Sequence, residues 1–128
     1  MDIQAVKPIV NSSTTLLASA ARTTTQTSAD LYNPYAQGIK VTVDVTTAGT
    51  GSITCTINFK DPASGKYVNL LTGAAITTAV TNTYTIFPGA TVTANVSAND
   101  QLPLVFQIVI TANNANTITY SVGYNLLG

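Results

Sequence analysis

The first place to look for chemistry is a charged stretch at residues 59–70, "FKDPASGKYVNL", in a chain with only five basic and five acidic residues. It contains Lys60, Asp61 and Lys66, and its Ser-Gly-Lys run suggests a phosphate-binding loop. Such a loop needs a glycine five positions before the Gly-Lys pair and a helix after it, because backbone amides must curl around the phosphate. Lys60 occupies that glycine position, and the residues after Lys66 alternate as in a strand. A hairpin loop is therefore predicted instead.

The residues inside the loop supply turn chemistry. Pro62 fixes the backbone at the second turn position, Asp61 can accept local amide hydrogen bonds, and Gly65 can adopt a positive φ. Lys60 and Lys66 are expected to flank the hairpin near Asp61, in an exposed pairing that contributes little stability. If the hairpin has a function beyond turning the chain, contact with a neighbouring subunit is favoured over catalysis.

Enzymatic groups are poorly supplied in the rest of the chain. It contains no His and no Glu, and its Asp residues are scattered at positions 2, 30, 44, 61 and 100. A Ser or Cys nucleophile would lack its usual His partner, and the pair Ser64 and Lys66 falls on an exposed turn. The single Cys55 alternates with isoleucines, a pattern typical of a small buried apolar residue. We predict that the chain is not an enzyme and uses no cofactor.

Two kinds of binding site compete with simpler interpretations of the same residues. The turns "SAND" and "ANNAN" contain Asp and Asn, which could bind calcium. Calcium usually needs several carboxylate ligands, and these turns provide one carboxylate among neutral amides, so a turn-forming role is favoured and no metal is expected. A carbohydrate-binding face would draw on the tyrosines, although Trp is absent and at least two tyrosines fall on core-like faces. The tyrosines are Tyr32, Tyr35, Tyr67, Tyr84, Tyr120 and Tyr124.

Composition limits the class of partner. A chain of 128 residues is the size of one domain, and 8% charged residues is far below the roughly 25% typical of soluble domains. The net charge of zero provides no basic surface for nucleic acid or anionic membranes. Asp2 stands where a signal peptide needs positive charge, and no apolar run approaches the ~20 residues of a membrane helix, so a soluble chain made in a cytoplasm is expected. Because low net charge protects a monomer poorly against self-association, the composition indicates a protein that acts as part of an assembly.

The candidate residues must be positioned by strands, because period-two alternation dominates the chain. It is clearest at residues 39–46, 52–59 and 118–124, whereas residues 102–112 are apolar on both faces and predict a central strand that pairs only after Pro103. Weaker strands are expected at 14–21, 66–71, 82–87 and 91–96. About eight strands separated by polar turns, with no substantial helix, predict an all-β fold, an antiparallel β-sandwich of jelly-roll or Ig-like type.

Two segments lie outside this pattern. Residues 1–13 are expected to be a flexible N-terminal arm, followed by a single β-sandwich domain over residues 14–128. Residues 23–38 form the main irregular stretch, predicted to be either a functional loop or a segment ordered by a partner.

Several segments, in this order and spacing, resemble the small all-β virion proteins encoded by tailed bacteriophages. They are "TLLASAART" (15–23), "SAD" (28–30), "VDVT" (43–46), "KDPASGKY" (60–67), Pro88 with Gly89, "ANDQLP" (98–103) and "ITYSVG" (118–123). The resemblance covers about residues 14–125. It implies a structural component of the phage particle, and in particular a head protein that decorates or cements the capsid.

The chain departs from this family's pattern at two positions. Gln37 stands where many relatives carry Arg before the glycine, and Leu104 stands where they often carry Arg after the Leu-Pro pair. Both changes remove a positive charge, which bears on any contact of these positions with an acidic capsid surface.

The expected function follows from the resemblance and from the neutral, polar composition. We expect the major capsid protein as partner, a homo-oligomer with a trimer favoured, and a place in the virion, with the capsid surface favoured, after synthesis in the host bacterial cytoplasm. A tail or neck component, and a receptor- or glycan-binding module, are the alternatives. Neutral polar surfaces suit such contacts because they avoid a large charge-desolvation cost, and the arm and residues 23–38 are expected to order on the partner. The candidate contact residues are Asp30, Tyr32, Tyr35, Gln37, Lys60, Asp61 and Lys66.

Overall fold

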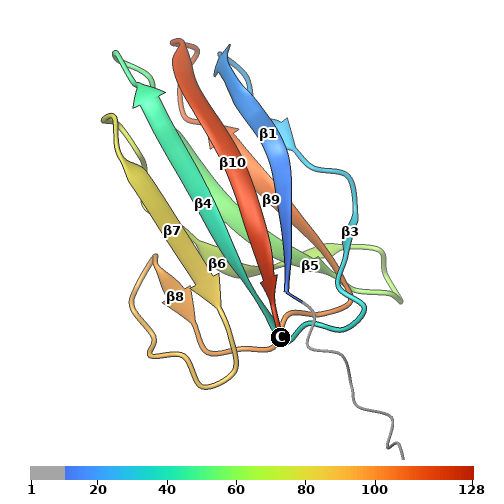
Figure 1. The fold of residues 1–128 in the computed structure, drawn as a ribbon. Coiled ribbons are helices and arrows are strands. Elements are labelled where there is room, and N and C mark those ends of the chain that lie inside the picture. Colours follow the sequence, from blue (N-terminus) through green and yellow to red (C-terminus); the bar gives the residue numbers. More distant parts are fainter. Residues whose placement is uncertain (1–10) are drawn as a thin grey trace, which may run out of the picture.

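The computed structural model describes residues 11–128, which form two β-sheets packed face to face (Figure 1). The strands are β1 (Ser12–Arg22), β2 (Gln26–Thr27), β3 (Leu31–Tyr32), β4 (Gly38–Thr47), β5 (Ile53–Lys60), β6 (Tyr67–Thr72), β7 (Thr81–Ile86), β8 (Ser97–Ala98), β9 (Val105–Ala112) and β10 (Ile118–Leu127). Neighbouring strands are antiparallel except for β7 and β8. The prediction of an all-β sandwich is confirmed. Nowhere in residues 11–128 does a helix occur that is long and apolar enough to cross a membrane.

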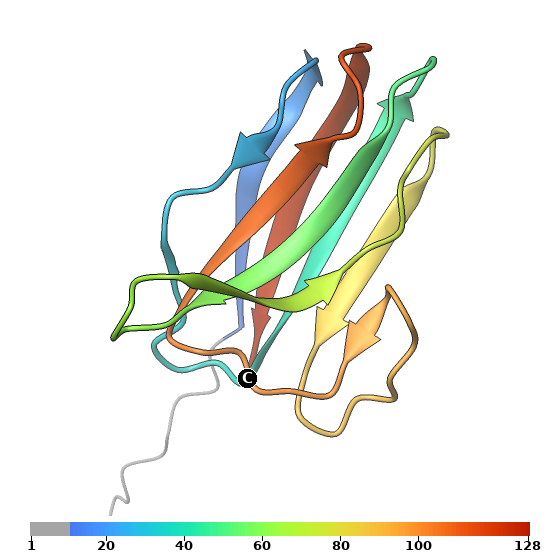
Figure 2. The ribbon, with the colours of Figure 1, turned by 180° about the vertical axis from the view of Figure 1, so that it is seen from behind.

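The order of the strands identifies the sandwich as a jelly roll. One sheet runs β1-β10-β4-β7-β8 and the other runs β2-β9-β5-β6, with β3 beside β9 (Figure 2). The pairs are nested, because β1 pairs with β10, β2 and β3 pair with β9, β4 pairs with β7, and β5 pairs with β6. This is the pairing of one long hairpin rolled into two sheets, which defines the jelly roll. Of the two predicted sandwich types, the Ig-like one is therefore wrong.

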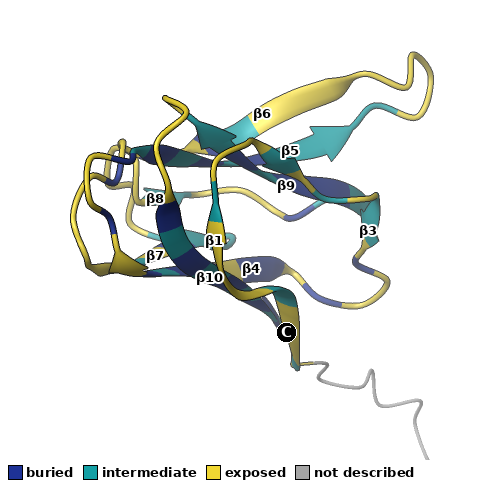
Figure 3. Cartoon of the chain, turned by 90° about the horizontal axis from the view of Figure 1, so that it is seen from above, coloured by how far each residue is buried: buried dark blue, intermediate teal, exposed yellow. Residues whose placement is uncertain are grey.

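The core lies between the two sheets and consists of the residues that the alternation predicts. Buried positions recur along the strands (Figure 3). One residue in two points inward along a strand, so β-branched and aromatic residues at alternate positions line a continuous apolar layer. On β4 and β10 these are Ile39, Val41, Val43, Val45, Ile118, Tyr120, Val122 and Tyr124, all buried. Strand β9 lies between β5 and the short strands β2 and β3, which confirms it as a central strand that begins after Pro103.

The strand predicted at residues 91–96 is wrong. This segment forms turns with one isolated bridge, between Thr93 and Ser97, and the next strand is the two-residue β8. The alternation of Val92 and Val96 suggested a half-buried strand, yet both side chains are exposed because no second layer covers them.

The two irregular segments have different outcomes. Most of the predicted arm, residues 1–10, lies outside the described residues, and its last two residues, Ser12 and Ser13, already pair with β10. Residues 23–38 are held by their own chain, since β2 and β3 both pair with β9. The expectation that only a partner would order this segment is therefore wrong.

Candidate functional site

The irregular segment and the charged hairpin, far apart in sequence, are joined by one acidic side chain. Asp30, which precedes β3, accepts a hydrogen bond from Lys60 Nζ at 2.9 Å through Oδ2 and another from the Tyr67 hydroxyl through Oδ1. Lys60 also lies over the Tyr67 ring, 5.7 Å from its centroid. The expected pairing of the hairpin lysines with Asp61 is thus wrong for Lys60, whose partner is Asp30. We call Asp30, Lys60 and Tyr67 the clamp.

The three groups of the clamp stabilise one another's bonding protonation states. The Tyr67 hydroxyl and then the Lys60 amine hold the pKa of the Asp30 carboxyl below its ordinary value. Conversely, Asp30 raises the pKa of Lys60, mainly by hydrogen bonding and then by its charge, and raises the pKa of Tyr67 by hydrogen bonding. All three groups keep their bonding protonation states through the neutral range, so the clamp fixes the hairpin to β3 there.

Strand register places two tyrosines in the same row across the end of the second sheet. Tyr32 on β3 is opposite Val105 on β9, and Lys60 on β5 is opposite Tyr67 on β6. Because Phe59 is opposite Phe106, the next residue, Lys60, lies beside Val105. Tyr32, Val105, Lys60 and Tyr67 therefore form one row across the four strands. Residues in one row share a face of the sheet, and here that face is the outer one.

The loop that follows β3 is anchored by one buried amide. Asn33 Nδ2 donates to the carbonyl oxygens of Ala36 and Leu102, and its Oδ1 accepts from the Ala36 N–H, each at 2.9 Å. The Asn33 backbone N–H donates to the Leu104 carbonyl at 2.8 Å. Every hydrogen-bonding group of this side chain is satisfied, so the loop has a defined shape, and it presents Tyr35 to solvent.

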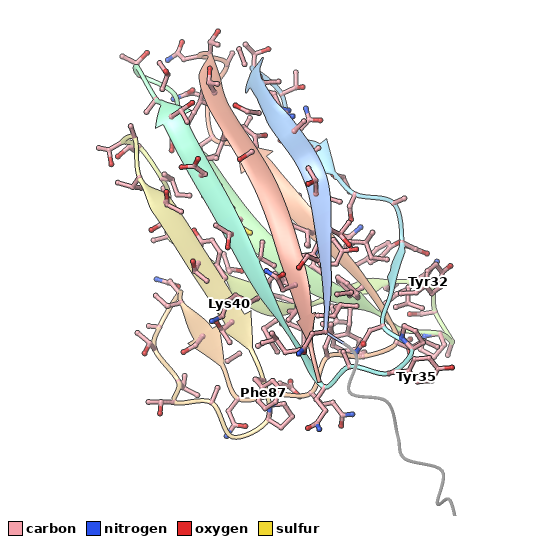
Figure 4. The ribbon with its side chains drawn as sticks, viewed as in Figure 1. Tyr32, Tyr35, Lys40 and Phe87 are labelled. Carbon is pink, nitrogen blue, oxygen red and sulfur yellow. The ribbon has the colours of Figure 1, made fainter. Side chains whose placement is uncertain are left out.

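Large apolar side chains gather in the open at this end of the sandwich. Tyr32, Tyr35, Tyr67 and Leu104 are exposed by 62%, 57%, 42% and 59%. We call these four side chains the tyrosine–leucine surface. Figure 4 shows Tyr32 and Tyr35 on one side of this end, with Lys40 and Phe87 on the other side. Two depressions adjoin Leu104, one toward Tyr35 and the other toward Phe59 and Pro62.

The remaining predicted contact residues lie at the same end with different surroundings. The 61–66 hairpin projects beyond the sheets (Figure 3), and its loop closes as predicted, with the Asp61 N–H donating to the Lys66 carbonyl at 2.8 Å and Gly65 at φ 72°. The Asp61 carboxylate accepts from the Ser64 N–H and hydroxyl, and these bonds lower its pKa. Lys66 is exposed, and Gln37 is exposed with its backbone bonded to Leu127 and Leu102.

Groups of other candidate sites have structural partners. Asp100 accepts from the Gln101 N–H and Asn114 accepts from the Asn116 N–H, which are turn-forming roles. Asn99 accepts from the Gly89 N–H, which joins two loops. No group of three or more His, Cys, Asp or Glu residues able to hold a metal occurs among residues 11–128. The Cys55 thiol is buried, and desolvation raises its pKa to about 12, as expected for a structural cysteine.

The tyrosines divide into two groups that the sequence only partly distinguished. Tyr84, Tyr120 and Tyr124 are buried, and Tyr120 lies beneath the Arg22 guanidinium, 4.8 Å from ring centroid to Cζ. The other three form part of the tyrosine–leucine surface. Two residues that shape this surface, Asn33 and Pro103, were not singled out as site residues, because no local pattern signals which Asn will be buried or which strands will meet.

No protein-family model and no curated protein matches the chain. Among solved structures it is similar to one titled "Structure of infectious bursal disease virus Gx strain", with a TM-score of 0.46 and 12% identity, over 94% of this chain and 34% of that one. The chain thus spans about a third of the length of that structure. A likeness of this degree carries no information about function.

Proposed function

We propose that this chain is a non-enzymatic structural protein of a tailed-bacteriophage virion, and that it decorates or cements the outer surface of the head. The observation that carries the proposal is the tyrosine–leucine surface, a group of exposed aromatic and apolar side chains at one end of a jelly roll. Exposed patches of this kind mark protein interaction sites, and tyrosine is enriched among the residues that dominate binding energy.

The rigidity of this surface supports the role. The clamp ties β3 to the β5–β6 hairpin, and Asn33 ties the following loop to the segment before β9. Segments held in place before binding lose less conformational entropy when a partner covers them, so each contact contributes more to affinity. Modest affinity per copy is sufficient on a capsid, because a lattice offers many equivalent sites.

The charge distribution also suits a capsid lattice. The chain has net charge zero, and the charged groups of Asp30, Lys60 and Asp61 are already paired or hydrogen-bonded within the molecule. A neutral surface can be covered by the major capsid protein without the cost of burying unpaired charge. Leu104 stands where relatives in the resembled family often carry Arg, so this end of the molecule is more apolar than the family pattern implies.

The test is binding of the purified chain to phage heads that lack it, measured by co-sedimentation and located by cryo-microscopy. Tyr32→Ser and Tyr35→Ser are each expected to weaken binding by about 2 kcal/mol, the scale of an interface hot spot. Val92→Ser removes an apolar side chain that is equally exposed but lies outside the tyrosine–leucine surface, and should bind as the parent chain does. Density confined to the tail or neck would show that the chain is a tail or neck component and not a head protein.

A second candidate function, a glycan- or receptor-binding module, is favoured by the exposure of Tyr32, Tyr35 and Tyr67 at one end. Tyrosine rings offer flat faces for sugar rings, and jelly rolls include lectin domains. Glycan-array binding that is lost in Tyr35→Ser, together with no binding to heads, would favour this function over capsid decoration.

A further inference from the structure

An apolar groove of about 320 Å³ adjoins the tyrosine–leucine surface and is lined by Phe59, Lys60, Pro62, Pro103, Leu104 and Val105. We propose that this groove binds residues 1–10 of a second copy of the chain, so that copies are joined by exchange of their N-terminal segments. The proposal concerns contacts between copies, and it leaves Tyr32 and Tyr35 available to the capsid.

The chemistry of the groove sets the chemistry of its occupant. Pro62 and Pro103 carry no backbone N–H, and Leu104 presents most of its side chain to solvent. The amine of Lys60 is directed to Asp30, which leaves its aliphatic stem along the groove. The occupant must therefore be apolar and bind mainly by burying side chains, because the groove offers few backbone donors for strand pairing.

The N-terminal segment has this composition. Residues 1–10, "MDIQAVKPIV", include Ile3, Val6 and Ile9 and only one charged side chain of each sign. Fully extended, ten residues reach at most about 35 Å, which is enough to cross to a neighbouring molecule.

The segment begins at the same end of the sandwich as the groove. The Gly128 N–H donates to Asn11 Oδ1 at 3.0 Å, and the Gln37 N–H donates to the Leu127 carbonyl at 2.8 Å. The Leu102 N–H then donates to the Gln37 carbonyl at 2.9 Å, two residues before Leu104. A short series of hydrogen bonds thus links the base of the segment to the edge of the groove.

The direction of β1 favours a second copy as the source of the segment. Strand β1 begins at this end of the sandwich and runs away from it, so the first described residues enter the sheet from outside the molecule (Figure 1). Returning to its own groove would require a tight turn, but residues 3–10 contain no Gly, Asn, Asp or Ser, and Pro8 is the only turn-forming residue. The neutral net charge also allows two copies to approach closely.

Disulfide trapping tests the exchange directly, because the buried Cys55 gives a low background of native thiol reaction. Full-length Ile3→Cys, Val6→Cys and Ile9→Cys chains are each mixed with Leu104→Cys chains and oxidised mildly. We expect a covalent heterodimer for at least one mixture, identified by mass spectrometry, and none when Val92→Cys replaces Leu104→Cys. Absence of the heterodimer in all three mixtures would overturn the proposal.

The double variant Ile9→Cys with Leu104→Cys in a single chain distinguishes the two sources of the segment. A disulfide-bonded monomer from this variant, with no heterodimer from the mixtures, would show that each chain covers its own groove and would refute exchange.

Analytical ultracentrifugation supplies the energetic test. Leu104→Ser is expected to weaken self-association about tenfold or more, the factor that corresponds to losing the burial of one leucine side chain. Leu104→Met should restore association, and Val92→Ser should leave it unchanged. Equal association of the parent chain and Leu104→Ser, or a parent chain that stays monomeric at high concentration, would overturn the proposal. These measurements use the isolated chain, so their failure would refute the exchange of N-terminal segments without bearing on the proposed binding to phage heads.

Discussion

Replacing Asn33 by Ala should loosen the loop that carries Tyr35 and destabilise the whole domain. The amide is only 5% exposed and makes three hydrogen bonds of 2.9 Å, two to carbonyl oxygens and one from a backbone N–H. Truncation leaves these three backbone groups without their partners. Each unmade bond costs roughly 1 kcal/mol, so the expected loss is about 3 kcal/mol. Against a typical stability of about 5–15 kcal/mol, this is a large fraction.

The assay is urea unfolding followed by far-UV circular dichroism, which suits a chain without Trp. Amide hydrogen exchange supplies the local readout, and protection should fall most at Ala36 and Leu102, whose N–H groups lie at the anchored loop. A loss below about 0.5 kcal/mol, the range of ordinary surface substitutions, would refute the view that Asn33 anchors this loop.

Asn33→Asp keeps the shape of the side chain but changes its hydrogen bonding, so it tests the contribution of the hydrogen bonds to stability. The carboxylate can accept from the Ala36 N–H, but it would face two carbonyl oxygens to which the amide donates. Burial and these oxygens disfavour the charged form, so the pKa of the new carboxyl rises on folding. A raised folded pKa means that the variant is least destabilised at acid pH and loses stability as the pH rises. Equal penalties at about pH 3 and pH 7 would contradict this account.

Three further predictions concern single side chains. Tyr120→Phe should leave the free energy of unfolding unchanged or raise it by about 1 kcal/mol, because the buried hydroxyl has no hydrogen-bond partner; a clear loss in urea unfolding would mean that the hydroxyl is bonded. Protection of the 61–66 hairpin from hydrogen exchange should be constant through neutral pH and fall at acid pH. The lowered pKa of Asp30 makes its contribution fully present above the ordinary value of 3.8 and lost as the pH falls through the folded value. Asp30→Asn should reduce this acid step to the part contributed by Asp61, whose pKa is lowered in the same way by its hydrogen bonds from Ser64. Cys55 should not react with Ellman's reagent in the native protein at pH 8 and should react fully in urea, because burial raises its pKa to about 12; fast native reaction would show that the strand opens.

The layers of the fold were predictable from the sequence because period-two alternation has a direct physical cause. Each strand must bury one face, so Ile39, Val41 and Val43 could be assigned to the core without knowledge of the neighbouring strand. The hairpin at residues 61–66 was predictable for a similarly local reason, since Pro62 and Gly65 determine backbone angles within the turn itself. The strand expected at 91–96 failed because alternation alone does not show whether a second layer is present.

The candidate contact residues were named from the sequence, but their arrangement was not readable there. Asp30 and Lys60 are separated by thirty positions, and only the pairing of β3 and β5 with β9 brings them to 2.9 Å. The sequence by itself determined that this chain builds a neutral β-sandwich with turns at its polar clusters, because alternation, turn residues and composition are local properties. Only the tertiary structure decided the nested strand order, the burial of Asn33 and the gathering of Tyr32, Tyr35, Tyr67 and Leu104 at one end. These features depend on contacts between distant segments, which no local pattern encodes.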